Sequence, residues 1–158
     1  AVLQQSYEEW QESSLSSLQI NGFTWEDVNF GVSLATVSSQ IQHCFTKNKI
    51  QREKAIFICQ NPSFDRAFFA QIIDPDLQER LLWPYHWLDL ASMHWALALA
   101  KRKNTEDPYP WDLGVSKDSI AKLYQVPTEA KPHRAMNGVN HLFLCYQALI
   151  GFSKKSDQ

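Results

Sequence analysis

The chain has 158 residues and a mass of 18.3 kDa, with 44% hydrophobic and 13% aromatic residues, which is enough for one compact domain with a core. Its 15 basic and 17 acidic residues leave a formal net charge of -2, which excludes the global positive field of a strongly basic nucleic-acid binder. No apolar run approaches the roughly 20 residues that cross a bilayer. We expect a cytoplasmic protein without a membrane partner.

Helical patterns dominate the first fifty residues. Loosely spaced apolar residues favour a helix over 1–20, which ends at Asn21-Gly22. Thr24 is a candidate N-cap for a short turn that follows. Apolar residues then recur at helical spacing from Leu34 to Phe45, which predicts a helix with Ser33 as its N-cap.

An uninterrupted apolar run, Ala55 to Cys59, is the strongest strand signal in the chain. It stops at Asn61-Pro62-Ser63, which is typical of a strand buried on both faces that opens into a turn. Such strands belong to sheets covered by helices on both sides. Chemistry in open α/β sheets gathers beyond the carboxyl ends of the strands, so Asp65 stands where a catalytic or metal-binding carboxylate would stand. Taken alone, Asp65 is better explained as a helix N-cap after the strand.

The second half alternates short helices and loops. Helical patterns cover 64–73, a short helix capped by Asp74 through residue 81, 92–103, 116–124 and 137–150. A second strand is predicted over 85–88, and Asp89 at its end is interpreted as the cap of the next helix. We expect the last helix to bury Val139, Leu142, Phe143, Tyr146, Leu149 and Ile150 and to end at Gly151, before a polar tail over 151–158.

Cysteines and most histidines are interpreted as structural. Cys44, Cys59 and Cys145 are odd in number and set among apolar residues, which favours buried free thiols in a reducing compartment. Four histidines have no ligand-like partner at useful spacing and are taken as structural or exposed: His43, His86, His94 and His141.

Three motifs in order resemble the DEDDh 3'-5' exonucleases, the group of the proofreading subunit, ribonuclease T and oligoribonuclease. They are Asn61-Pro62-Ser63-Phe64-Asp65, Trp87-Leu88-Asp89-Leu90, and Pro132-His133-Arg134-Ala135-Met136 ahead of an apolar helix. The segment from Gly114 to Val126 is also similar to the family's approach to its histidine. The resemblance covers most of the chain.

The resemblance implies an α/β, RNase H-like fold, with a mixed sheet flanked by helices in a single exonuclease-like domain over 1–158. It also implies hydrolysis of phosphodiester bonds at the 3' end of single-stranded or short DNA or RNA by two Mg²⁺ or Mn²⁺ ions. By position, His133 matches the general base and Asp65 a metal-binding carboxylate.

Two departures from the family pattern leave an alternative open. The first motif, an Asp-x-Glu on the opening strand, is not found, and we expect the N-terminal strands of the sheet to be absent from this chain. The last Asp would fall at Gly138, and Asn140 offers an uncharged amide oxygen as a doubtful metal ligand. The alternative is a catalytically inactive scaffold on the same fold that binds nucleic acid or protein.

Substrate contacts are expected from Asn61, Phe64 and Trp111. Five aromatic residues could stack on bases, although core or dimer-interface packing is the commoner role and a homodimer is allowed: Phe64, Phe68, Trp83, Trp87 and Trp111. Tyr109 and Trp111 lie in a proline-containing loop ahead of His133 and are the best candidates for nucleotide contact.

Overall fold

The computed structural model describes residues 1–151, so residues 152–158 of the expected polar tail lie outside the described residues. Helices dominate this range, and two short strands pair into a parallel sheet, which is consistent with the α/β class. The chain divides into two compact units. The first holds Ala1–Phe57 and Ser63–His86, and the second holds Ile58–Pro62 and the chain from Trp87. The single domain over 1–158 and the RNase H-like topology stay predictions.

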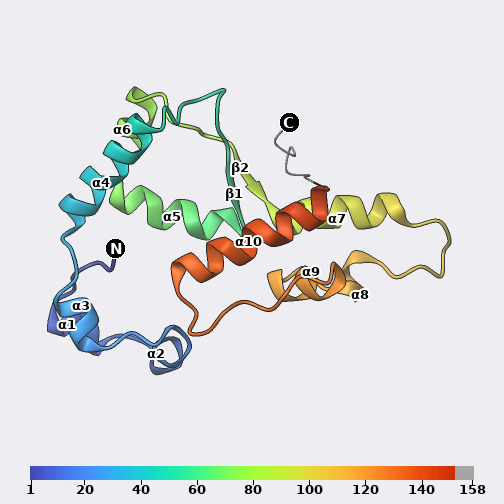
Figure 1. The fold of residues 1–158 in the computed structure, drawn as a ribbon, viewed down its shortest axis with the longest axis horizontal. Coiled ribbons are helices and arrows are strands. Elements are labelled where there is room, and N and C mark those ends of the chain that lie inside the picture. The colour runs from blue at the N-terminus through green and yellow to red at the C-terminus, as the bar shows by residue number, and fades with distance from the viewer. Residues whose placement is uncertain (152–158) are drawn as a thin grey trace, which may run out of the picture. The chain divides into compact units, whose positions relative to one another are not determined.

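Figure 1 labels the helices and strands in chain order. Over the described residues they are α1 (Tyr7–Gln11), α2 (Leu15–Asn21), α3 (Trp25–Asn29), α4 (Leu34–Lys47), β1 (Phe57–Cys59), α5 (Pro62–Ile72), α6 (Pro75–Arg80), β2 (Trp87–Asp89), α7 (Leu90–Lys101), α8 (Pro110–Leu113), α9 (Lys117–Leu123) and α10 (Ala135–Ile150). None of these helices has both the length and the apolar character needed to cross a membrane.

Local capping explains where the helices of the first unit begin. The predicted caps Thr24, Ser33 and Asp74 are confirmed, since each side chain accepts a backbone N–H from the first turn of its helix. The single helix expected over 1–20 is wrong: the chain forms α1 and α2, because Ser14 adopts an extended backbone between them. Gly22, in the left-handed conformation, ends α2.

The N-terminal segment is held to the start of α4 by a close backbone contact. Leu3 and Val32 form a parallel bridge, in which the Gln4 N–H donates to the Val32 carbonyl over 2.9 Å. Gly31 is needed beside this bridge, because a Cβ atom there would lie 2.6 Å from the Gln4 nitrogen. Any larger residue at this position would push the two segments apart.

Aromatic rings form the core of the first unit. Phe45 of α4 lies 4.3 Å from Trp83 between ring centroids, and Phe69 of α5 packs 5.7 Å from Phe57 and 6.1 Å from Trp83. Trp83 is only 4% exposed. It is therefore a core residue, the commoner of the two roles expected for it, and its ring is closed to a base.

The strand at the centre of the sequence is shorter and more exposed than expected. Only Phe57 to Cys59 forms β1, and burial on both faces is wrong, because Ile56 is 48% exposed and Cys59 alone in β1 is buried. A strand of a two-stranded sheet has one neighbour, so its apolar run is not enclosed as it would be in a larger sheet.

The second unit packs α7, α9 and α10 around one apolar core. Its buried residues are Leu90, Ile120, Ala121, Cys145 and Leu149. In α10 the buried positions are spaced four residues apart, at His141, Cys145 and Leu149.

The buried face expected for the last helix is partly wrong. Val139, Phe143 and Ile150 are 53%, 55% and 43% exposed, although Leu149 is buried. The cysteine prediction holds for Cys59 and Cys145, which are buried free thiols, but not for Cys44, which is exposed.

Candidate functional site

Asp89 ties the end of β1 to the start of α7. One carboxylate oxygen accepts the Asn61 N–H over 3.1 Å and the Ala91 N–H over 3.2 Å, while the other accepts the Ser92 N–H and hydroxyl over 3.1 and 2.6 Å. Burial opposes the charge, but the Ser92 hydroxyl and the backbone donors outweigh it and hold the pKa of Asp89 below its ordinary value. The interpretation of Asp89 as a helix cap is confirmed.

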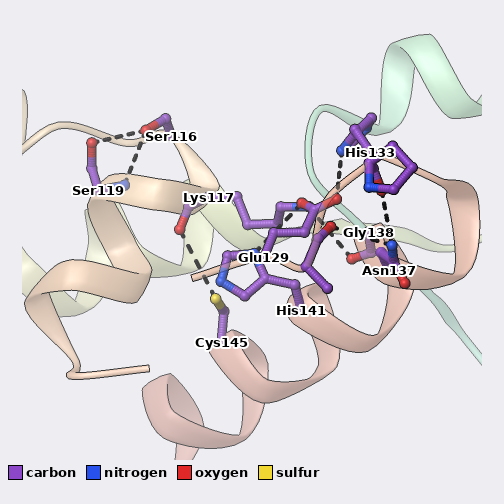
Figure 2. A network of polar contacts seen from close by, with 11 residues as sticks. Ser116, Lys117, Ser119, Glu129, His133, Asn137, Gly138, His141 and Cys145 are labelled. Carbon is purple, nitrogen blue, oxygen red and sulfur yellow. Dashed lines mark hydrogen bonds and ion pairs between the residues drawn. The ribbon is translucent and has the colours of Figure 1, made fainter. Parts of the chain in front are cut away.

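A partly buried carboxylate, Glu129, organises the polar cluster of the second unit (Figure 2). It lies on the loop between α9 and α10, and its side chain is 12% exposed. One oxygen contacts the Lys117 Nζ at 2.5 Å, and the other contacts the His133 Nδ1 at 2.5 Å. Lys117, the first residue of α9, is itself only 16% exposed. The start of α9 and the loop residue His133 therefore converge on one carboxylate.

The charge of Glu129 survives its burial because of these partners. Burial raises the pKa of the carboxyl group, but the hydrogen bond and charge of Lys117, together with those of His133, outweigh it and leave the pKa below the ordinary value. An ionised carboxylate can only accept hydrogen bonds. A hydrogen bond in the Glu129–His133 contact would therefore have Nδ1 of the imidazole as its donor.

That contact bears on which ring nitrogen of His133 can accept a proton. With the hydrogen on Nδ1, the neutral imidazole carries its lone pair on Nε2, which is the nitrogen that can accept a proton. The side chain is 56% exposed, so water and solutes reach it. A carboxylate behind the ring and an accessible second nitrogen are what a histidine general base requires.

Two residues of α10 complete the cluster around His133. The Asn137 side chain donates to the Pro132 and Ala130 carbonyls over 2.9 and 3.2 Å, which fastens the loop to the helix. At Gly138, a Cβ atom would lie 3.7 Å from the Glu129 Oε1, the His133 Cε1 and the Lys117 Nζ, so the position faces the cluster directly. Figure 2 shows Gly138 between Glu129 and Asn137.

His141 backs the cluster from inside the core. It is 3% exposed, and its Nδ1 lies 3.7 Å from the Glu129 Oε2, beyond hydrogen-bonding distance. Neither ring nitrogen has a hydrogen-bond partner among the described residues. The structural role expected for His141 is in keeping with this burial, and its ring closes the inner side of Glu129.

The residues around His133 do not by themselves make a two-metal centre. Within residues 1–151 no three His, Cys, Asp or Glu side chains gather into a group that could hold a metal ion. Glu129 is already bound to Lys117 and His133, and the Lys117 ammonium would repel a cation placed beside Gly138. Asn140, the doubtful amide ligand, is exposed on α10.

The other predicted site residues lie outside this cluster. Asp65 is exposed in the first turn of α5 and is not the N-cap, because the helix already begins at Pro62. It belongs to the first unit and His133 to the second, so a metal pocket shared by the two stays a prediction. Phe64 is 62% exposed and packs on Phe68 at 4.6 Å between centroids. Asn61 is exposed.

Glu129 and Lys117 are the two residues that the sequence did not single out. Their contact joins a loop to a helix start across twelve positions, and no periodic pattern marks such a contact. The one available signal is the spacing of Glu129 four residues before His133. Comparison of the chain with models of known protein families, with curated proteins and with solved structures finds no match.

Proposed function

We propose that this protein is a 3'-5' exonuclease of the DEDDh type, in which His133 is the general base. The observation that carries the proposal is the 2.5 Å contact between the His133 Nδ1 and the partly buried Glu129 Oε1, on a histidine side chain that is 56% exposed. The order of the three sequence motifs supports it independently. The substrate class is single-stranded or short DNA or RNA.

His133 would act on a water molecule at the terminal phosphodiester. Its Nε2 takes one proton as the water oxygen attacks phosphorus, the bond from phosphorus to the 3' oxygen of the preceding nucleotide breaks, and that oxygen takes a proton from solvent. The products are a nucleoside 5'-monophosphate and a strand shorter by one nucleotide. Glu129 holds the ring in the required tautomer and stabilises the imidazolium that forms.

A second candidate, a nucleic-acid-binding scaffold without turnover, is favoured by one specific observation. Lys117 and Gly138 occupy the side of the cluster where the resemblance places the last metal-binding Asp. A fixed ammonium and a missing carboxylate both lower the affinity of that position for Mg²⁺. The binding surface of an exonuclease could persist there without its chemistry.

The test is the release of mononucleotides from a 5'-labelled single strand by the intact protein, with Mg²⁺, with Mn²⁺ and with a chelator. For an exonuclease we expect a ladder of shortened products and a loss of about 10²- to 10⁴-fold in rate for His133→Ala. His43→Ala, which removes an exposed histidine of α4, is the matched control and should leave the rate unchanged.

Two further arms separate the candidates. Asp65→Asn should lower the metal-dependent rate if Asp65 is the proposed metal ligand. Binding of the strand with no turnover under any metal condition would reject the exonuclease and support the scaffold. A rate that His133→Ala leaves intact would reject His133 as the base.

A further inference from the structure

An aromatic and guanidinium stack is formed by the loop from α7 to α8 and by Trp111 at the start of α8; the loop is seen in Figure 1 where the chain leaves α7. The Arg102 guanidinium carbon lies 3.5 Å from the centroid of the Tyr109 ring. On Tyr109, in turn, the Trp111 ring stacks at 4.2 Å with an interplanar angle of 7°. Tyr109 therefore contacts Arg102 as well as the nearly parallel ring of Trp111, and the three groups form one pile with Trp111 at one end.

The loop that carries this stack is fastened by its own hydrogen bonds. Arg102 donates from Nε to the Asp107 carbonyl over 3.0 Å and from Nη2 to the Thr105 carbonyl over 2.9 Å. The Asp107 carboxylate accepts the Lys103 and Asn104 N–H groups over 2.7 and 2.9 Å, and these two donors lower its pKa. The orientation of Tyr109 is thus set before any ligand arrives.

Trp111 keeps most of its surface open at the end of this pile. Trp111 is 58% exposed. Trp95 of α7 approaches at 5.6 Å between centroids but is tilted by 44°, so the two indoles do not lie face to face. Arg102 and Tyr109 already hold the loop, which means that fastening the loop does not require an exposed indole beyond them.

The charges around the stack are balanced. Residues 101–112 contain three basic side chains, Lys101, Arg102 and Lys103, and three acidic ones, Glu106, Asp107 and Asp112. This segment has no net charge with which to attract a phosphate backbone. A ligand would be held by its flat face, which every nucleobase offers.

We propose that Trp111 is a stacking platform for one unpaired nucleobase of a single-stranded nucleic acid, on a pile preorganised by Tyr109 and Arg102. The inference rests on the proposed function, which supplies the single-stranded ligand. A planar base extends the pile by one layer and adds no charge. The contact is tolerant of base identity and depends weakly on salt, because few phosphates are neutralised.

The test is fluorescence anisotropy of a short labelled single strand with the full chain carrying His133→Ala, in the presence of a chelator, so that binding is measured without turnover. Trp111→Ala should weaken binding by about 5- to 150-fold, the range for one stacked base, and Trp111→Phe should weaken it less. Phe143→Ala is the matched control, because Phe143 is 55% exposed on α10 and should leave binding unchanged.

A second arm leaves residue 111 untouched. A strand with a single abasic position, moved along its length, should lose affinity at one position, whereas an oligosaccharide should not compete. Equal binding by Trp111→Ala, equal binding of every abasic strand, or displacement by the oligosaccharide would overturn the inference. If the protein binds the strand through Trp111 but does not hydrolyse it, only the proposed catalysis is rejected. If the protein hydrolyses the strand but Trp111→Ala leaves binding unchanged, only the stacking platform is rejected.

Discussion

Each unit of the chain holds an ion pair with a glutamate, and the two pairs differ in their exposure. In the first unit Arg52 meets Glu79 through two contacts of 2.9 and 2.5 Å, with the Glu79 side chain 67% exposed. In the second unit Lys117 meets Glu129 with both side chains less than a fifth exposed, at 16% and 12%. The first pair is exposed on its Glu79 side, whereas the second pair is shielded on both sides and contacts His133 through Glu129.

The cores of the two units also differ, in the polarity of the side chains that they bury. The first unit fills its interior with aromatic rings such as Phe45, Phe69 and Trp83. The second unit encloses two histidines, His94 at 0% and His141 at 3% exposure, next to its apolar core. Buried polar groups cost free energy and are often kept where a site needs them. These two buried histidines distinguish the second unit, to which Glu129 and His133 also belong.

Breaking the buried pair should have the largest effect on stability. Lys117→Met leaves the partly buried Glu129 carboxylate without its ammonium partner, and we expect the free energy of unfolding to fall by about 1 to 3 kcal/mol. Urea unfolding followed at amide signals of α9 and α10 measures this loss. A change below about 1 kcal/mol would show that the pair behaves as a surface pair.

Acid should lower stability by a smaller amount than breaking the Lys117–Glu129 pair by mutation, because protonation of Glu129 leaves both side chains intact. The pKa of Glu129 is lowered in the folded protein, so its contribution is fully present above the ordinary value of 4.5 and is lost as pH falls through the folded pKa. Below pH 4.5, the free energy of unfolding should therefore fall more steeply with decreasing pH for the parent protein than for Glu129→Gln. Parallel pH profiles would contradict this assignment.

Removing the cap at Asp89 should cost less again. Asp89→Ala deprives the first turn of α7 and the Asn61 N–H of their acceptor, and we expect a loss of about 1 kcal/mol. Asp89→Asn keeps a capping oxygen and should recover part of it. Amide exchange at Asn61, Ala91 and Ser92 reports the loss locally, and unchanged protection there would speak against the cap.

The surface pair of the first unit should be nearly neutral. Arg52→Met is expected to change the free energy of unfolding by about 0 to 1 kcal/mol, less at high salt, because solvent screens the exposed Glu79. Urea unfolding of the variant at two salt concentrations checks this. A loss as large as that of Lys117→Met would remove the contrast between the two units.

Local signals made parts of the fold predictable from the sequence. The caps at Thr24, Ser33, Asp74 and Asp89 were predictable because a cap is decided by a side chain and the backbone of the next turn. The buried face of α10 was not. That helix contains no charged residue, so only uncharged polar residues mark its polar side, and the pattern pointed to Phe143 where the packing chose His141.

The candidate site was predictable only at its centre. His133 follows from its motif, but its partners depend on tertiary contacts: Glu129 comes from an irregular loop, and Lys117 from the start of a separate helix. Spacing along the chain carries no information about such contacts unless both residues share one element.

The proposed role of His133 as general base depends on the tautomer of its ring. The nitrogen chemical shifts of the ring report this tautomer directly. Nitrogen-15 spectra of the full chain near neutral pH should show Nδ1 bearing hydrogen and Nε2 bare, and Glu129→Gln should weaken this preference. A ring with its hydrogen on Nε2, unaffected by the change at Glu129, would contradict the proposed base.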